Sequence, residues 1–169
     1  MDKNKKTNKV ELSIIVAMYN EEAVIPAFFE KILSILTNMQ VTYEIVCVDD
    51  GSTDTALSLL YQFSQPNEHI KVISFSRNFG KEIALSAGLD YATGQAVVFI
   101  DADLQDPPEL IEQFYARWYV CEVLAGNRGL HGFQWLIVRI KIPKADACPI
   151  ITRLARAAAD HQIVIGSSG

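Results

Sequence analysis

The sequence predicts an α/β fold in which an open, mostly parallel sheet carries helices on both faces. Three observations support this fold class. Half of the 169 residues are hydrophobic and 21% are charged, as in globular proteins long enough to bury a sizeable core. Short apolar runs begin roughly every 27 residues along the chain. Segments with helix-start signals follow these runs, which is the pattern of right-handed βαβ units.

The first two strand–helix units are clearly marked. Residues 12–18 (LSIIVAM) form a near-continuous apolar run, as expected for a strand covered on both faces. Asn20 is expected to cap a helix that reaches about residue 37, because the two glutamates after it suit the positive end of a helix. Residues 43–48 predict the second strand. The next helix is expected within residues 52–63, with Ser52 or Thr53 as its cap.

The following units repeat this pattern. Residues 70–75 and 96–100 predict the third and fourth strands, with a helix between them at residues 81–92. Pro108 predicts the start of a further helix, because proline suits the first helical turn. A fifth, shorter strand is expected from Val123. Strand and helix signals blur beyond residue 129.

Composition divides the chain into three parts. Residues 1–10 are lysine-rich and are expected to form a flexible N-terminus, since no signal-peptide core follows them. Residues 11–128 hold the regular pattern and predict a ligand-binding domain. Residues 129–169 end in a basic, alanine-rich stretch and predict a divergent or truncated C-terminal tail. No apolar run approaches the ~18 residues that span a bilayer, so no transmembrane segment is predicted.

Several function classes are disfavoured. The net charge of −5 argues against a nucleic-acid partner, which a basic surface would bind. A dinucleotide-binding dehydrogenase would carry a glycine-rich loop after the first strand, where residues 19–22 read YNEE. The sequence also lacks a Walker-type phosphate loop. Its three cysteines have no paired spacing, which is typical of reduced thiols in a cytoplasmic setting.

The most informative stretch is residues 97–108, where two carboxylates follow a buried strand (VVFIDADLQDPP). In extended backbone residues i and i+2 face the same side, so Asp101 and Asp103 can reach one ligand. Two carboxylates aimed at one point repel each other unless a cation lies between them. This geometry suits a hard divalent metal that holds a substrate diphosphate.

Polar clusters also follow the other predicted strands. The carboxyl ends of parallel strands lie at one edge of the sheet, where such folds bind their ligands. A single carboxylate at a strand end is more often a cap or a turn residue. Four clusters in phase favour one shared binding site. They are residues 19–21, 49–52, 76–78 and 101–103.

These residues resemble the family 2 inverting glycosyltransferases, which have the Rossmann-like GT-A fold. The resemblance covers about residues 11–128 and is closest to the dolichol-, undecaprenyl- and bactoprenol-phosphate sugar transferases. Four motifs carry it, and their order and spacing are far more specific than the Asp-x-Asp pattern alone. They are residues 17–22 (AMYNEE), 48–54 (VDDGSTD), 75–82 (FSRNFGKE) and 99–108 (FIDADLQDPP).

The resemblance implies that residues 11–128 are a nucleotide-sugar-binding domain. Arg128 matches a family arginine near the phosphates. Arg77 and Lys81 lie in the third motif, where salt bridges and a helix start are their ordinary roles and a direct phosphate contact is the alternative. Four residues match positions that hold the base and ribose of the nucleotide: Tyr19, Glu21, Asp49 and Asp50.

The same resemblance implies a site for Mg²⁺ or Mn²⁺. Asp103 would be the main metal ligand and the centre of the chemistry. Asp101 would lie near both the ribose and the metal, and Gln105 matches a further ligand.

A member of this family would move a sugar, glucose in the bactoprenol enzymes, from a UDP-linked donor to a polyprenyl phosphate with inversion. The metal would stabilise the leaving nucleoside diphosphate. A phosphate monoester with a second pKa near ~6 is largely ionised at neutral pH, so this acceptor does not need the carboxylate base that a hydroxyl needs. We expect the reaction at the cytoplasmic side of the cell membrane, with the intact relative bound to the membrane surface.

A second hypothesis stays open. Residues 129–169 carry no acceptor motif of the family, so the alternative is a catalytically incomplete fragment that at best binds nucleotide. A nucleotidyltransferase on a similar fold lacks support, because no second glycine-rich nucleotide-binding motif is present.

Overall fold

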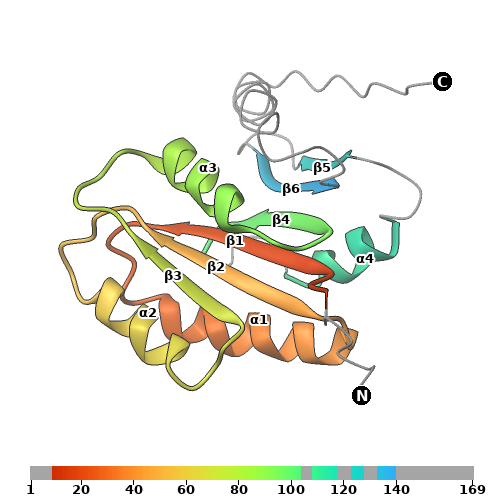
Figure 1. Ribbon diagram of the computed structural model, residues 1–169, viewed down its shortest axis with the longest axis horizontal. Coiled ribbons are helices and arrows are strands. Elements are labelled where there is room, and N and C mark those ends of the chain that lie inside the picture. The colour runs from red at the N-terminus through yellow and green to blue at the C-terminus, as the bar shows by residue number, and fades with distance from the viewer. Residues whose placement is uncertain (1–8, 104–107, 118–122, 128–132, 140–169) are drawn as a thin grey trace, which may run out of the picture.

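The computed structural model describes residues 9–103, 108–117, 123–127 and 133–139. These residues form one sheet with helices packed on it (Figure 1). Strands and helices alternate through the first four units, as predicted. In chain order the elements are β1 (Leu12–Met18), α1 (Ile25–Met39), β2 (Tyr43–Asp49), α2 (Ala56–Ser64), β3 (Ile70–Ser74), α3 (Lys81–Tyr91), β4 (Ala96–Ile100), α4 (Leu110–Arg117), β5 (Val123–Asn127) and β6 (Phe133–Arg139).

The six strands lie in the order β3-β2-β1-β4-β6-β5. Strands β1 to β4 are parallel, with β1 paired to both β2 and β4 and β2 paired to β3. Strand β6 runs antiparallel to both β4 and β5. The prediction of a mostly parallel α/β sheet is confirmed. The sheet continues past the predicted boundary at residue 128, because it includes β6, which ends at Arg139. Where the binding domain ends stays a prediction.

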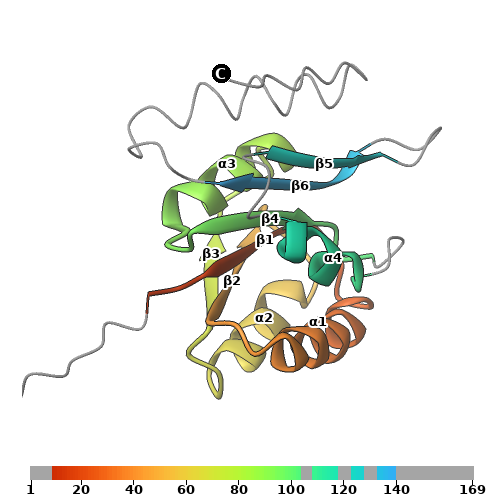
Figure 2. The ribbon, with the colours of Figure 1, turned by 90° about the vertical axis from the view of Figure 1, so that its right-hand side faces the viewer.

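Helices cover both faces of the sheet (Figures 1 and 2). Helices α1, α2 and α4 lie on one face and α3 lies on the other. Alternate residues of β1 separate two hydrophobic cores: Ile14 packs in the cluster that contains Phe28, Leu60 and Ile111, and Ile15 packs in the α3 cluster. This double burial explains why the β1 sequence is apolar almost throughout.

Helix α3 lies unusually close to the sheet at Gly88. A Cβ atom at this position would lie 2.4 Å from Ile15 Cγ2 and 3.2 Å from Val48 Cγ2. Because a side chain would overpack this contact, only glycine fits here without a shift of the helix. The close approach fixes the height of α3 above β1 and β2.

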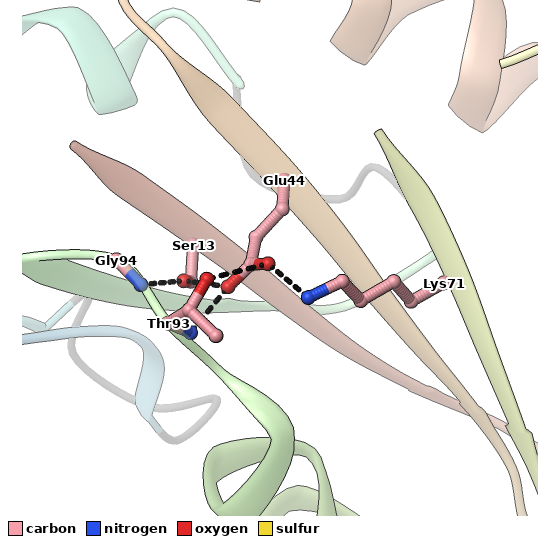
Figure 3. Close-up of polar contacts among 5 residues, drawn as sticks. All are labelled: Ser13, Glu44, Lys71, Thr93 and Gly94. Atoms are coloured by element: carbon pink, nitrogen blue, oxygen red, sulfur yellow. Dashed lines mark hydrogen bonds and ion pairs between the residues drawn. The ribbon is translucent and has the colours of Figure 1, made fainter. Parts of the chain in front are cut away.

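A buried carboxylate ties the strands together near their amino ends (Figure 3). Glu44 is 2% exposed, and its Oε1 accepts hydrogen bonds from Ser13 Oγ (2.6 Å) and Thr93 N (2.5 Å). Its Oε2 accepts from Lys71 Nζ (2.5 Å) and Thr93 Oγ1 (3.0 Å). Gly94 N in turn donates to Ser13 Oγ (2.8 Å). This network joins β1, β2 and β3 to the turn that follows α3.

The predicted N-caps at Asn20 and at Ser52 or Thr53 are wrong. Helix α1 begins at Ile25 and α2 at Ala56, a few residues later than predicted. Asn20 has a φ of 55°, in the left-handed region, so it forms a turn instead of opening a helix. The predicted cap side chains bond across the two loops. The residues that do precede the helices, Val24 and Thr55, make no side-chain cap hydrogen bond.

Candidate active site

A pocket of about 370 Å³ lies at the carboxyl ends of the parallel strands. All four polar clusters predicted from the strand ends contribute to it, so the predicted convergence is confirmed for these segments. Its lining comes from the end of β1 and from the segments that follow β1, β2, β3 and β4. The lining residues are Ala17, Met18, Tyr19, Glu21, Asp50, Asn78, Gly80, Lys81, Asp101, Ala102 and Asp103.

Most of the predicted site residues meet in this pocket. Asp49 does not line it, and Gln105 and Arg128 lie outside the described residues. For Lys81 the sequence leaves a phosphate contact only as an alternative, and it indicates no role for Asn78. Both residues lie in the third motif, which is the signal that could have identified them. The predicted residues that line the pocket are Tyr19, Glu21, Asp50, Asp101 and Asp103.

Residues between β1 and α1 alternate between the pocket and the next loop. Tyr19 and Glu21 line the pocket, whereas Asn20 and Glu22 bond to the loop between β2 and α2. The alternation fixes Glu21, because the residues on both sides of it are held. The backbone N–H groups that donate across the two loops are Asn20 N to Ser52 Oγ (3.0 Å), Glu22 N to Asp54 Oδ2 (3.1 Å), Thr53 N to Asn20 Oδ1 (2.8 Å) and Thr55 N to Glu22 Oε2 (2.9 Å).

Asp50 connects the end of β2 to the loop that precedes α3. It is 2% exposed, and its Oδ1 and Oδ2 accept hydrogen bonds from Phe79 N (2.7 Å) and Gly80 N (2.8 Å). Gly51 has a φ of 71°, and a Cβ there would lie 2.3 Å from the carbonyl carbon of Arg77. The two loops therefore touch backbone to backbone, which requires glycine. Asp50 thus positions the start of α3 as well as lining the pocket.

Asp49 points into the turn that follows β2. Its Oδ2 accepts a hydrogen bond from Ser74 Oγ (3.3 Å), and both of its carboxylate oxygens lie 3.4 Å from Ser52 N. Asp49 is buried. These contacts support the turn, and the predicted contact of Asp49 with a nucleotide stays a prediction.

Negative charge gathers at the exit of β4. Asp101 Oδ1 pairs with Lys81 Nζ at 2.5 Å. Burial raises the pKa of the Glu21 carboxyl, and the charges of Asp103 and Asp101 raise it further. Glu21 Oε2 is buried and has no hydrogen-bond partner among the described residues. A buried acceptor without a partner is rare in folded proteins, so this part of the pocket is suited to a cation or a ligand donor.

The acidic side chains fit a metal ion that is bound partly by the protein and partly by a substrate. Among the residues that the structure describes, no group of three or more acidic, histidine or cysteine side chains could hold a metal ion. Asp101 and Asp103 offer two carboxylates. Mg²⁺ is usually bound by one or two carboxylates together with substrate phosphates and water. The pair therefore fits a metal–diphosphate complex.

The fold and the pocket define an α/β protein with an acidic pocket at the carboxyl ends of its parallel strands. Within this class the chain belongs to glycosyl transferase family 2, whose pattern matches residues 13–136.

Two relatives illustrate the similarity. An uncharacterized glycosyltransferase of Synechocystis is 56% identical over 129 residues, which are 75% of this chain and 41% of the relative. A prophage bactoprenol glucosyl transferase homolog of Escherichia coli is 40% identical over 109 residues, 64% of this chain and 36% of the relative. The chain thus spans less than half the length of these relatives.

Solved structures agree with the fold. The S. aureus protein TarS (residues 1–349), in complex with UDP-GlcNAc, is 26% identical with a TM-score of 0.54, over 72% of this chain and 37% of TarS. A mannosyltransferase from Pyrobaculum calidifontis, in complex with GDP-Man and Mn²⁺, has a TM-score of 0.59 at 22% identity, over 76% of this chain and 44% of the other. The second likeness concerns the fold alone. The expected GT-A fold is confirmed.

Proposed function

We propose that this chain forms the donor site of an inverting glycosyltransferase that moves a sugar from a nucleotide sugar to a polyprenyl phosphate. The convergence of Asp101, Asp103 and the partly buried Glu21 on one pocket is the observation that carries this proposal. The name of the E. coli relative supports glucose as the sugar, and the UDP-GlcNAc complex of TarS supports a UDP-linked donor.

Asp101 and Asp103 would hold Mg²⁺ or Mn²⁺ in this site, with Gln105 as a further ligand. The bound metal would supply positive charge that stabilises the leaving nucleoside diphosphate. The ion pair between Lys81 and Asp101 supports this assignment, because Asp101 already binds a cation at the pocket.

The nucleoside would lie against the loops that follow β1 and β2. Tyr19 is 44% exposed at the pocket and offers an aromatic face to the base. Glu21 Oε2, which has no hydrogen-bond partner among the described residues, would accept a hydrogen bond from a ribose hydroxyl. Asp50 would contribute from the lone pairs that its two backbone donors leave free. Asp49 and Arg128 complete the proposed donor contacts.

The acceptor phosphate would attack the sugar from the face opposite the leaving diphosphate, which gives inversion. Because a phosphate monoester is largely ionised at neutral pH, no carboxylate base is required. We place the reaction at the cytoplasmic side of the cell membrane. Among the described residues, no helix is long and apolar enough to cross a membrane.

A transfer assay tests this function. The full chain is mixed with radiolabelled UDP-glucose, Mn²⁺ and a polyprenyl phosphate in detergent, and label in the organic phase is counted. We expect metal-dependent transfer, and Asp103→Ala should lower its rate by about 100-fold or more. Glu68→Gln, which changes an exposed carboxylate before β3, should transfer at the wild-type rate.

The same assay separates the two hypotheses for this chain. Calorimetric binding of UDP without any transfer would support the alternative, a catalytically incomplete fragment that binds nucleotide. Transfer that persists in Asp103→Ala, or a chain that neither binds UDP nor transfers label, would contradict the assignment of the site.

A further inference from the structure

Lys81 has an unusual position at the pocket. It is the first residue of α3, and its ammonium pairs with Asp101, a proposed metal ligand, at 2.5 Å. The Lys81 side chain is 56% exposed and that of Asp101 is 25% exposed. An ion pair between an exposed ammonium and a partly exposed carboxylate is screened by water, so it is weak and exchanges easily. The ammonium therefore occupies the place of a cation without being locked there.

The charges around Lys81 make it distinctive. The described lining of the pocket contains four carboxylates, those of Glu21, Asp50, Asp101 and Asp103, and Lys81 is the one basic side chain in that lining. Arg77, from the same loop, instead lies with its guanidinium carbon 4.7 Å from the centre of the Phe79 ring.

The backbone that leads to Lys81 is held in place. Asp50 accepts hydrogen bonds from Phe79 N and Gly80 N, so the start of α3 is fixed against β2. The lysine side chain itself is a compact charge on a flexible four-carbon stem. A fixed Cα with a mobile ammonium allows Lys81 to change partners within the pocket while the helix stays where it is.

We propose that Lys81 is a placeholder cation that neutralises Asp101 before the metal binds and then moves to the diphosphate of the nucleotide sugar. This inference rests on the proposed function, since it requires a metal on Asp101 and a diphosphate beside it. Lys81 would thus bind and position the nucleotide-sugar donor.

Two opposite effects of Lys81 follow. Without nucleotide, the ammonium competes with the metal for Asp101 and so weakens metal binding. With metal bound, the displaced ammonium is free to bind phosphate oxygens and so strengthens nucleotide binding. Loss of the lysine should therefore strengthen metal binding and weaken nucleotide binding. Damage to the fold would weaken both.

The variant Lys81→Met tests this inference with two binding measurements on the full chain. Electron paramagnetic resonance of free Mn²⁺, without nucleotide, should show Mn²⁺ bound about two- to fivefold more tightly than by wild type. Calorimetry at saturating Mn²⁺ should show UDP bound about tenfold more weakly.

Lys31→Met is the matched control. Lys31 pairs with Glu109, and neither residue lines the pocket. Their side chains are 47% and 50% exposed, so the loss of Lys31 should change neither affinity. Suppose that wild type binds both Mn²⁺ and UDP. If Lys81→Met then binds both more weakly, or binds both with unchanged affinity, the placeholder role is wrong and the donor site stands. If wild type binds neither Mn²⁺ nor UDP, the donor site and the placeholder role both fail.

Discussion

Two glutamates at opposite ends of the parallel strands have contrasting surroundings. Glu44, near the amino ends of the strands, accepts four hydrogen bonds. Burial alone would raise the pKa of Glu44, but the bonds from Lys71, Ser13 and Thr93 outweigh it and hold the pKa below 4.5. Glu21, at the carboxyl ends, has a raised pKa and a buried oxygen without a described partner. Glu44 stabilises the fold, and Glu21 is left available for a ligand.

The variant Glu44→Gln should lower the free energy of unfolding by about 2 kcal/mol at pH 7, because it replaces charge-assisted hydrogen bonds in a buried site. The folded-state pKa of Glu44 lies below its ordinary value of 4.5. The contribution of the Glu44 charge to the free energy of unfolding is therefore complete above pH 4.5 and is lost as the pH falls through the folded-state pKa. Urea unfolding at a series of pH values measures this difference.

The expected signature is a stability gap between wild type and Glu44→Gln that narrows steadily below pH 4.5. Glu68→Gln should match wild type across the same range. A gap of equal size at pH 7 and pH 3 would show that the charge of Glu44 is not what stabilises the network.

At the scale of elements, three loops hold one another around the pocket. The loop before α1 bonds to the loop before α2, and Asp50 bonds to the loop before α3. Helix α3 is also held at its other end, where Thr93 binds Glu44. The pocket walls are therefore fixed partly by Asp50 within the lining and partly by contacts between residues that do not line the pocket.

The variant Asn20→Gly should weaken UDP binding about fivefold, because the loop that carries Tyr19 and Glu21 loses its side-chain bonds to Thr53. Glycine tolerates the positive φ of this position, so the backbone is not strained. Calorimetry with UDP and Mn²⁺ measures the effect.

Gln40→Gly provides the comparison for Asn20→Gly. Gln40 has a φ of 54° at the far end of α1, so this change has the same backbone character away from the pocket. It should leave UDP affinity unchanged. Equal UDP affinity in wild type and Asn20→Gly would mean that the link between the two loops does not position the donor site.

The elements that the sequence predicted best are those with local signals. Strands β1 and β4 have the predicted bounds, because continuous apolar runs marked them. The N-cap of α1 was predicted four residues early, at Asn20 instead of Val24, since Asn20 carries the chemistry of a cap but bonds to Thr53, 33 residues away. Strand β6 was not predicted, because its place depends on antiparallel pairing with the distant β4. Long-range partners cannot be read from a local pattern.

Across the molecule, the amino ends and the carboxyl ends of the parallel strands have different roles. The amino edge holds a satisfied network that links the strands, and the carboxyl edge holds an acidic pocket. The convergence of the strand-end clusters was predictable from the parallel topology. The pairing of Lys81 with Asp101 and the backbone bonds of Asp50 were not, because they depend on how the loops fold against each other.

The central claim is that the acidic pocket binds a nucleoside diphosphate through a divalent metal on Asp101 and Asp103. Calorimetric titration of UDP into the chain, with and without Mn²⁺, tests it most directly when wild type is compared with Asp103→Asn. We expect Mn²⁺ to strengthen UDP binding to wild type by about tenfold or more and to have little effect on UDP binding to the variant. Equal UDP affinity with and without Mn²⁺ in wild type, or an undiminished Mn²⁺ effect in Asp103→Asn, would contradict it.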